Sequence, residues 1–227
     1  RQLRRDDWLD IARRLRAAGK EVVLSTLTLI EADSELQSLE RLCVQEEFVV
    51  EANDMAAVQA RGGRVFVGGA TLNLYNARSL QRLHAAGMRR WVMPVELSGA
   101  TLADLQAQRP AGLETEVFAF GRLPLAYSAR CFTARAYNLP KDDCQFRCLD
   151  HSDGMLMSTR EDQAFLCLNG IQTQSAQTQS LLAELPRLAE LGVEVLRISP
   201  QSQHTLKIIE VFDRCLRGEM SPTEGQA

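Results

Sequence analysis

The 227-residue sequence lacks the features that define several common classes of protein. No apolar run approaches the ~20 residues of a membrane-spanning helix. No strand-like run is followed by a Gly-x-Gly-x-x-Gly or P-loop signature, and the zinc-protease and serine-hydrolase signatures are missing too. With 26 basic and 29 acidic residues the net charge is −3, which gives no general surface for nucleic acid. We therefore expect no transmembrane segment, no nucleotide-binding sheet and no nucleic-acid partner.

Histidine is scarce, with three residues in the chain, whereas cysteine is comparatively frequent, with six. No secretory leader opens the sequence, and a chain of this length does not need a disulfide framework to fold. We therefore expect reduced thiols in a cytoplasmic protein, some of them bound to metal.

Short apolar runs alternate with helical patterns along the chain, which predicts an α/β fold. The candidate strands are Glu21–Leu27, Phe48–Ala52, Arg64–Gly68, Arg90–Pro94, Glu116–Phe120, Ala164–Leu168 and Val193–Ile198. Such nearly continuous apolar runs are typical of parallel strands buried on both faces. Because the first element is a helix and seven strands follow, we expect residues 1–227 to form a single (β/α)8, TIM-like barrel domain without its first strand. A doubly wound sheet is the alternative.

Polar residues gather where several of these candidate strands end. Chemistry in a barrel lies at the C-terminal ends of the strands. The residues expected to bind substrate there are Glu51, Asn73, Glu96, Arg130 and Arg197. Carboxylate and guanidinium groups at such a mouth suit an anionic, oxygen-rich substrate held by charge-assisted hydrogen bonds. Strand-end capping is the alternative for each residue taken singly, and no catalytic residue is assigned.

The six cysteines separate into two groups. Cys43, Cys167 and Cys215 lie in apolar helical or strand patterns, and we expect each to be a small buried hydrophobe. The other three, Cys131, Cys144 and Cys148, lie in a loop at about 128–160.

Three cysteines in a loop without apolar periodicity are typical of a metal or iron–sulfur site. Three ligands are one fewer than the usual four. The fourth remains open between His151, Cys43 and a residue outside this sequence. Sulfur ligands admit both zinc and iron–sulfur, so the residue types alone leave that choice open as well.

Several segments resemble, in order along the chain, the collagenase-like peptidase family. These segments are 24–27, 93–98, 123–131, 140–148, 168–173 and 197–200. They are most similar to the branch that acts in ubiquinone biosynthesis, formed by the UbiU and UbiV subfamilies. UbiU-like sequences carry a further cysteine where this chain has Pro124. The resemblance is therefore to the UbiV side of that branch.

The resemblance implies a barrel-like fold, of which this chain lacks the C-terminal tail. It implies a [4Fe–4S] cluster in a subunit of an oxygen-independent hydroxylase of ubiquinone-precursor rings under anaerobic conditions. It implies Cys131, Cys144 and Cys148 as cluster ligands, with the fourth ligand expected N-terminal to Arg1. It also implies a heterodimer with a UbiU-like paralogue, a small lipid-binding, UbiT-like accessory protein, and prephenate as oxygen donor. Two alternatives are a non-catalytic iron–sulfur subunit of that heterodimer and a peptidase of the same family.

Overall fold

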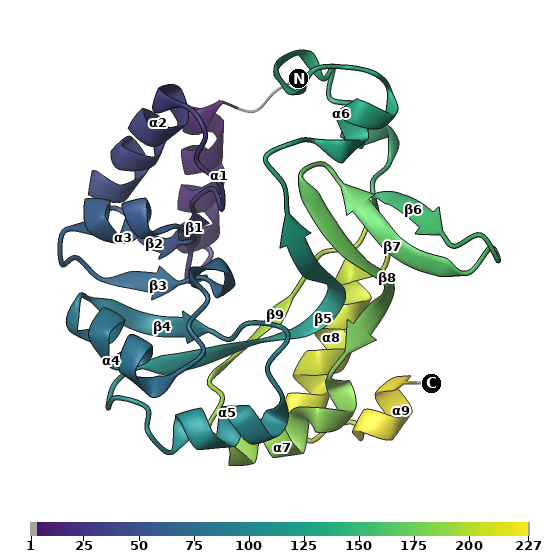
Figure 1. The fold of residues 1–227 in the computed structure, drawn as a ribbon. Coiled ribbons are helices and arrows are strands. Elements are labelled where there is room, and N and C mark those ends of the chain that lie inside the picture. The colour runs from purple at the N-terminus through teal and green to yellow at the C-terminus, as the bar shows by residue number, and fades with distance from the viewer. Residues whose placement is uncertain (1–3, 227) are drawn as a thin grey trace.

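The computed structural model describes residues 4–226, in which one curled sheet is flanked by helices (Figure 1). The strands of this part of the chain are β1 (Val23–Ser25), β2 (Val49–Ala52), β3 (Phe66–Gly68), β4 (Met88–Val92), β5 (Glu114–Tyr127), β6 (Met155–Ser158), β7 (Ala164–Asn169), β8 (Gln172–Ser180) and β9 (Val195–Ile198). Their order is β1-β2-β3-β4-β5-β8-β7-β6, and β9 also pairs with β5. The pairs from β1 to β5, and β5 with β9, are parallel, whereas β5–β8, β8–β7 and β7–β6 are antiparallel.

The helices of the same part of the chain are α1 (Arg5–Ala17), α2 (Asp33–Val44), α3 (Met55–Arg61), α4 (Ala77–Ala85), α5 (Gly99–Gln106), α6 (Phe132–Ala136), α7 (Leu185–Glu190), α8 (Thr205–Leu216) and α9 (Pro222–Gln226). Helices α2 to α5 connect the parallel strands β1 to β5 and lie around the outside of their curve (Figure 1). Helix α1 precedes β1, α6 lies between β5 and β6, α7 precedes β9, and α8 and α9 follow β9. Asp54, Asn76 and Ser98 begin α3, α4 and α5, because each side chain accepts a hydrogen bond from a backbone N–H of the first turn. No helix within residues 4–226 is long and apolar enough to cross a membrane.

The two faces of the parallel strands carry different side chains, because successive residues of a strand point to opposite sides. Val50, Phe66, Trp91 and Val117 belong to the main core, which also contains buried residues of α2 to α5 and α7. The other face lines a cavity and carries a charged residue on several strands, among them Glu51, Arg90, Glu116 and Arg197.

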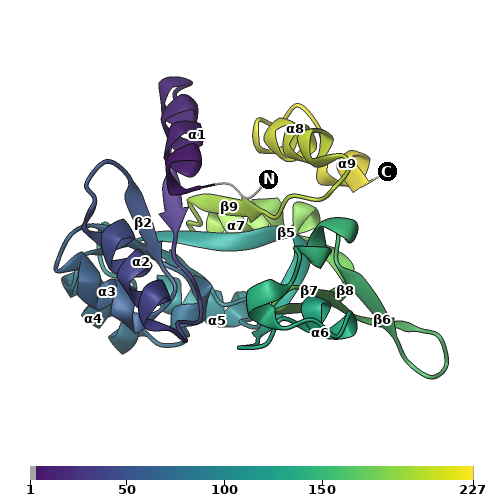
Figure 2. The ribbon, with the colours of Figure 1, turned by 90° about the horizontal axis from the view of Figure 1, so that it is seen from above.

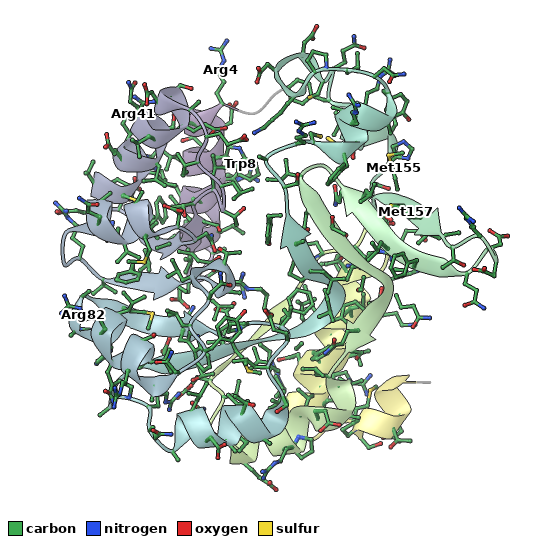
Figure 3. The ribbon with its side chains drawn as sticks, in the orientation of Figure 1. Arg4, Trp8, Arg41, Arg82, Met155 and Met157 are labelled. Atoms are coloured by element: carbon green, nitrogen blue, oxygen red, sulfur yellow. The ribbon has the colours of Figure 1, made fainter. Side chains whose placement is uncertain are left out.

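Strand β5 belongs to two parts of the sheet. Its first half pairs with β4 and β9, and its second half, from Phe120 to Tyr127, pairs with β8. The strand changes partners near Gly121, whose φ is +132°. The ribbon formed by β6, β7 and β8 therefore projects away from the parallel strands (Figure 2). Met155 and Met157 lie on this ribbon, far from the helix residues Trp8 and Arg82 (Figure 3).

The structure confirms the α/β class and six of the seven predicted strands as parallel members of the sheet. The prediction was wrong for Ala164–Leu168, which is a strand but runs antiparallel in the ribbon. The curled sheet is compatible with an α/β barrel. Within the described residues β1 pairs only with β2, and β9 only with β5, so these two edges are not joined to each other. The predicted loop at 128–160 also holds α6 and β6.

Candidate functional site

A cavity of about 600 Å³ lies along the inner face of the parallel strands and reaches their carboxyl ends. Its apolar walls include Val23, Val67, Val92, Phe118 and Val195. Its charged lining residues are Glu21, Glu51, Arg90, Glu116 and Arg197. Tyr127 at the end of β5 and Gln172 at the start of β8 also line it. The cavity therefore combines an apolar body with a few convergent polar groups, which is typical of a small-molecule site.

Arg197 on β9 lies between two buried carboxylates. Its Nη2 is paired with Glu51 and its Nε donates to Glu116, while only 7% of each carboxylate side chain is exposed. Burial alone would lower the pKa of Arg197. The hydrogen bonds that Arg197 donates to Glu51, and the negative charges of Glu51 and Glu116, outweigh burial and raise this pKa. Arg197 is therefore a permanent cation that joins β2, β5 and β9 across the inner face of the sheet.

Asn53, which follows β2, fixes the position of Glu51. Its Nδ2 donates to Ser25 Oγ at 2.8 Å, to the Thr26 carbonyl at 3.1 Å and to Glu51 Oε1 at 3.2 Å. Thr71 Oγ1 in turn donates to the Asn53 carbonyl at 2.8 Å. These bonds hold the ends of β1, β2 and β3 in register around the Glu51 carboxylate.

A second arginine, Arg90 on β4, is paired in the same manner. It donates to Glu114 at 2.8 Å and to Glu21 at 2.9 Å, and its Nη1 lies 3.9 Å from Glu116. Burial would lower the pKa of Arg90, but the hydrogen bonds to Glu21 and Glu114 raise it. Both arginines of the cavity are thus satisfied by carboxylates of this chain.

The last residue of β5, Tyr127, adds a phenol to the lining of the cavity. Gln172 Nε2 donates to the Tyr127 hydroxyl at 2.8 Å. Burial raises the pKa of Tyr127; the hydrogen bond from Gln172 acts in the opposite direction, and the charge of Glu51 adds to the rise. Tyr127 therefore keeps its proton at neutral pH.

The structure brings only part of the predicted substrate-binding set together. Glu51 and Arg197 line the cavity in direct contact, but Asn73, Glu96 and Arg130 are exposed and do not line it. Asn73 ends a 3₁₀ turn (Ala70–Leu72) in the left-handed conformation, with φ +55°. Glu116 was missed by the sequence prediction, although a carboxylate directly before the apolar run Val-Phe-Ala-Phe, within the same strand, is a signal for an inward-facing polar group.

Glu96 has a different partner, the hydroxyl of Tyr75. This hydrogen bond is the main cause that raises the pKa of Tyr75 to about 12. The folded protein therefore holds this proton more tightly than the unfolded chain. The stabilisation is fully present below the ordinary tyrosine pKa of about 10 and is lost as the pH rises toward 12.

The replacement Glu96→Gln is expected to return the pKa of Tyr75 toward about 10, because a neutral amide no longer opposes ionisation. Phenolate absorbance near 295 nm, read within seconds of a pH jump, measures this titration. Tyr75→Phe identifies the Tyr75 contribution among the three tyrosines. An unchanged alkaline titration in Glu96→Gln would contradict the assignment.

The three clustered cysteines lie on the segment between β5 and β6. Cys131 begins α6, where its Sγ accepts from the Ala134 N–H at 3.4 Å. Cys144 ends the 3₁₀ turn Lys141–Asp143, and Cys148 lies in the turn Arg147–Asp150. All three thiols are free and half-buried.

Three free thiols on one segment fit a thiolate-bound metal or cluster in donor chemistry. The three side chains are not close enough together to form a site, because within residues 4–226 no three His, Cys, Asp or Glu side chains are grouped as metal ligands. Of the two possible fourth ligands in the chain, the ring of His151 is hydrogen-bonded through Nε2 to the Tyr137 hydroxyl at 2.7 Å. Cys43 is fully buried in the core, where burial raises the pKa of its thiol.

The remaining predicted structural cysteines differ in burial. Cys167 on β7 is buried, as Cys43 is, and its Sγ donates to the Asp153 carbonyl at 3.1 Å. Cys215 packs against the smaller core cluster around Phe212 but is only half-buried. The prediction of a small buried hydrophobe is therefore confirmed for Cys43 and Cys167. Cys215 is only partly buried, so for this residue the prediction overstated the burial.

The cysteine segment spans from the ribbon to the opposite side of the sheet. At one end, Phe132 N donates to the Gly170 carbonyl at 2.9 Å, and Gly170 N donates to Thr133 Oγ1 at 3.0 Å. At the other end, Lys141 forms an ion pair with Glu31, in the connection between β1 and α2. The segment thereby contacts both the β7–β8 connection and the β1–α2 connection.

The curled sheet, its outer helices and the inner cavity define an α/β protein with a candidate binding site along the inner faces of its strands. The model of peptidase family U32 matches residues 1–217. Because the match covers nearly the whole chain, the protein belongs to peptidase family U32. No solved structure matches the chain.

Proposed function

We propose that the protein is a UbiV-like subunit of an oxygen-independent, iron–sulfur dependent hydroxylase of ubiquinone-precursor rings, acting in the cytoplasm under anaerobic conditions. Its partners would be a UbiU-like paralogue in a heterodimer and a small UbiT-like lipid-binding protein, with prephenate as oxygen donor. The observation that carries the proposal is the set of three free thiols on one segment that also contacts the β1–α2 connection through Lys141.

Cys131, Cys144 and Cys148 would hold a [4Fe–4S] cluster together with a fourth ligand that the resemblance places before Arg1. Such a cluster supplies one-electron transfer when it is bound. The protein's own part would be to hold the three thiolates on the segment between β5 and β6.

The proposal predicts iron and sulfide in the full-length protein. After anaerobic co-expression and purification with the paralogue, each subunit is expected to hold about four iron and four sulfide ions with charge-transfer absorbance. Cys144→Ser is expected to remove the cluster of this subunit and to halve the iron and sulfide of a heterodimer with one cluster per subunit. Cys215→Ser is the matched control, because Cys215 is also half-buried but lies outside the segment. This variant should retain the full iron and sulfide content.

Two outcomes would contradict parts of the proposal. Zinc without sulfide in the anaerobic preparation would exclude an iron–sulfur cluster. Loss of the cluster in Cys144→Ser without loss of ring hydroxylation would favour the alternative of a non-catalytic iron–sulfur subunit.

The family match supports peptide hydrolysis as a second candidate function. In residues 4–226, no Ser, Thr or Cys side chain is hydrogen-bonded to a histidine ring: His84 contacts the Met88 carbonyl and Arg89, and His151 contacts Tyr137. The usual pairing of nucleophile and base is thus not assembled there. Cleavage of a peptide library by the anaerobically purified protein, abolished by Glu51→Gln, would support the peptidase.

A further inference from the structure

We propose that the inner cavity binds an apolar ring through a carbonyl oxygen of the ligand, which accepts a hydrogen bond from the Tyr127 hydroxyl. The inference goes beyond the proposed hydroxylase, because it assigns a ligand class and a binding residue to the cavity and does not depend on the cluster. It starts from the direction of the hydrogen bonds that reach Tyr127 from β8.

Two glutamines of β8 determine which way the Tyr127 hydroxyl points. Gln174 Nε2 donates to Gln172 Oε1, which leaves the amide nitrogen of Gln172 turned toward Tyr127. Gln172 Nε2 then donates to the Tyr127 hydroxyl oxygen at 2.8 Å. Because that oxygen accepts the bond, the hydroxyl hydrogen points away from Gln172. Tyr127 and Gln172 both line the cavity, so the two glutamines present a hydrogen-bond donor to it.

The hydroxyl hydrogen of Tyr127 is open to a ligand. Among residues 4–226, the bond accepted from Gln172 is the one hydrogen bond that this hydroxyl makes. The carboxylate of Glu51, on the same cavity wall, is already engaged by Asn53 and Arg197. The charge of Glu51 raises the pKa of Tyr127 more than the charge of Arg197 lowers it. This net negative field favours a hydroxyl hydrogen that faces the cavity, since the hydrogen carries the positive end of the O–H dipole.

The walls of the cavity suit a ring with a carbonyl group. Val23, Val67, Val92 and Phe118 form its apolar lining, and its volume of about 600 Å³ is adequate for one substituted aromatic ring. A carbonyl oxygen supplies the acceptor that Tyr127 lacks. It is uncharged, so it enters the apolar cavity without the desolvation cost of an ionised group.

The test compares acetophenone with isopropenylbenzene, which has the same shape but carries a methylene group in place of the carbonyl oxygen. Both probes are titrated into the full-length protein at about pH 8 by calorimetry or ligand-detected NMR. Tyr127→Phe is expected to weaken acetophenone binding about fivefold, as for the loss of one neutral hydrogen bond, and to leave isopropenylbenzene unchanged. Tyr75→Phe is the matched control and should change neither probe, because the Tyr75 hydroxyl is bonded to Glu96 and does not line the cavity.

Gln172 is a positioning residue, and Gln172→Glu tests its role. The new carboxylate would accept the hydroxyl hydrogen of Tyr127 and withdraw it from the ligand. Acetophenone binding should therefore fall as it does in Tyr127→Phe, whereas isopropenylbenzene should keep its affinity. Infrared spectroscopy gives a direct readout, because a hydrogen bond lowers the carbonyl stretching frequency of bound acetophenone. The frequency should be lowered in the unmodified protein and should return toward its value in an apolar solvent in both variants.

Absence of acetophenone binding, or a bound carbonyl frequency equal to that in an apolar solvent, would overturn the inference, and neither measurement needs a variant. An equal loss of both probes in Tyr127→Phe would indicate lost packing and would overturn it as well. Unchanged acetophenone binding in Tyr127→Phe would show that Tyr127 donates to Gln172 and not to the ligand. Iron and sulfide content, measured on the same samples, reports the proposed cluster separately.

Discussion

Replacing Arg197 by methionine is expected to lower the free energy of unfolding by about 3 kcal/mol, measured by urea denaturation at neutral pH. The replacement keeps much of the aliphatic volume but leaves the buried carboxylates of Glu51 and Glu116 without their shared cation. Removing one partner of a buried pair costs about 3–5 kcal/mol. We expect the lower end of that range because 34% of the Arg197 side chain is exposed.

The cause of this loss can be separated from lost packing. The triple variant Arg197→Met, Glu51→Gln, Glu116→Gln removes the orphaned charges and should recover at least half of the lost stability. Arg217→Met is the matched control, because Arg217 pairs with Asp213 on the surface of α8 and is 65% exposed. Its effect should stay within about 0.5 kcal/mol. If Arg197→Met lowered the free energy of unfolding as little as Arg217→Met, the ion pairs of Arg197 with Glu51 and Glu116 would not stabilise the fold.

Hydrophobic periodicity was sufficient for the parallel part of the sheet and insufficient for the ribbon. Strands such as Phe66–Gly68 and Val195–Ile198 are short apolar runs bounded by turn residues, so they stand out in the sequence. Strand β8 reads Gln-Thr-Gln-Ser-Ala-Gln-Thr-Gln-Ser and has almost no apolar residue. It is held by backbone pairing with β5 and β7, which no apolar pattern reveals. Strand β7 was detectable, but its antiparallel direction depends on that same pairing.

The candidate site was predictable to the extent that its residues lie where predicted strands end. Glu51 and Arg197 lie near the carboxyl ends of two predicted strands and were identified for that reason. Their mutual contact, and the contact of Arg197 with Glu116, join residues 146 and 81 positions apart and follow only from the register of β5 with β9 and the curl of the sheet. Asn73 and Glu96 lie near strand ends in the sequence, but their connections turn them outward, and sequence position alone does not show this.

Gly121→Ala is expected to lower the free energy of unfolding by about 2–4 kcal/mol, because this glycine lies where β5 leaves β9 and joins β8. Its φ of +132° is unfavourable for any residue with a side chain. A Cβ atom there would lie 2.5 Å from Ser199 Cβ and 3.0 Å from Phe118 Cζ, and Phe118 and Ser199 both line the cavity. We therefore expect the strain to loosen the end of β9 and to speed amide exchange in β8, measured by hydrogen–deuterium exchange alongside urea denaturation.

The matched control is Gly99→Ala in α5, where a Cβ meets no atom within 4 Å; it should change the free energy of unfolding by less than about 0.5 kcal/mol. Equal effects of the two replacements would show that the bend at Gly121 does not need a glycine.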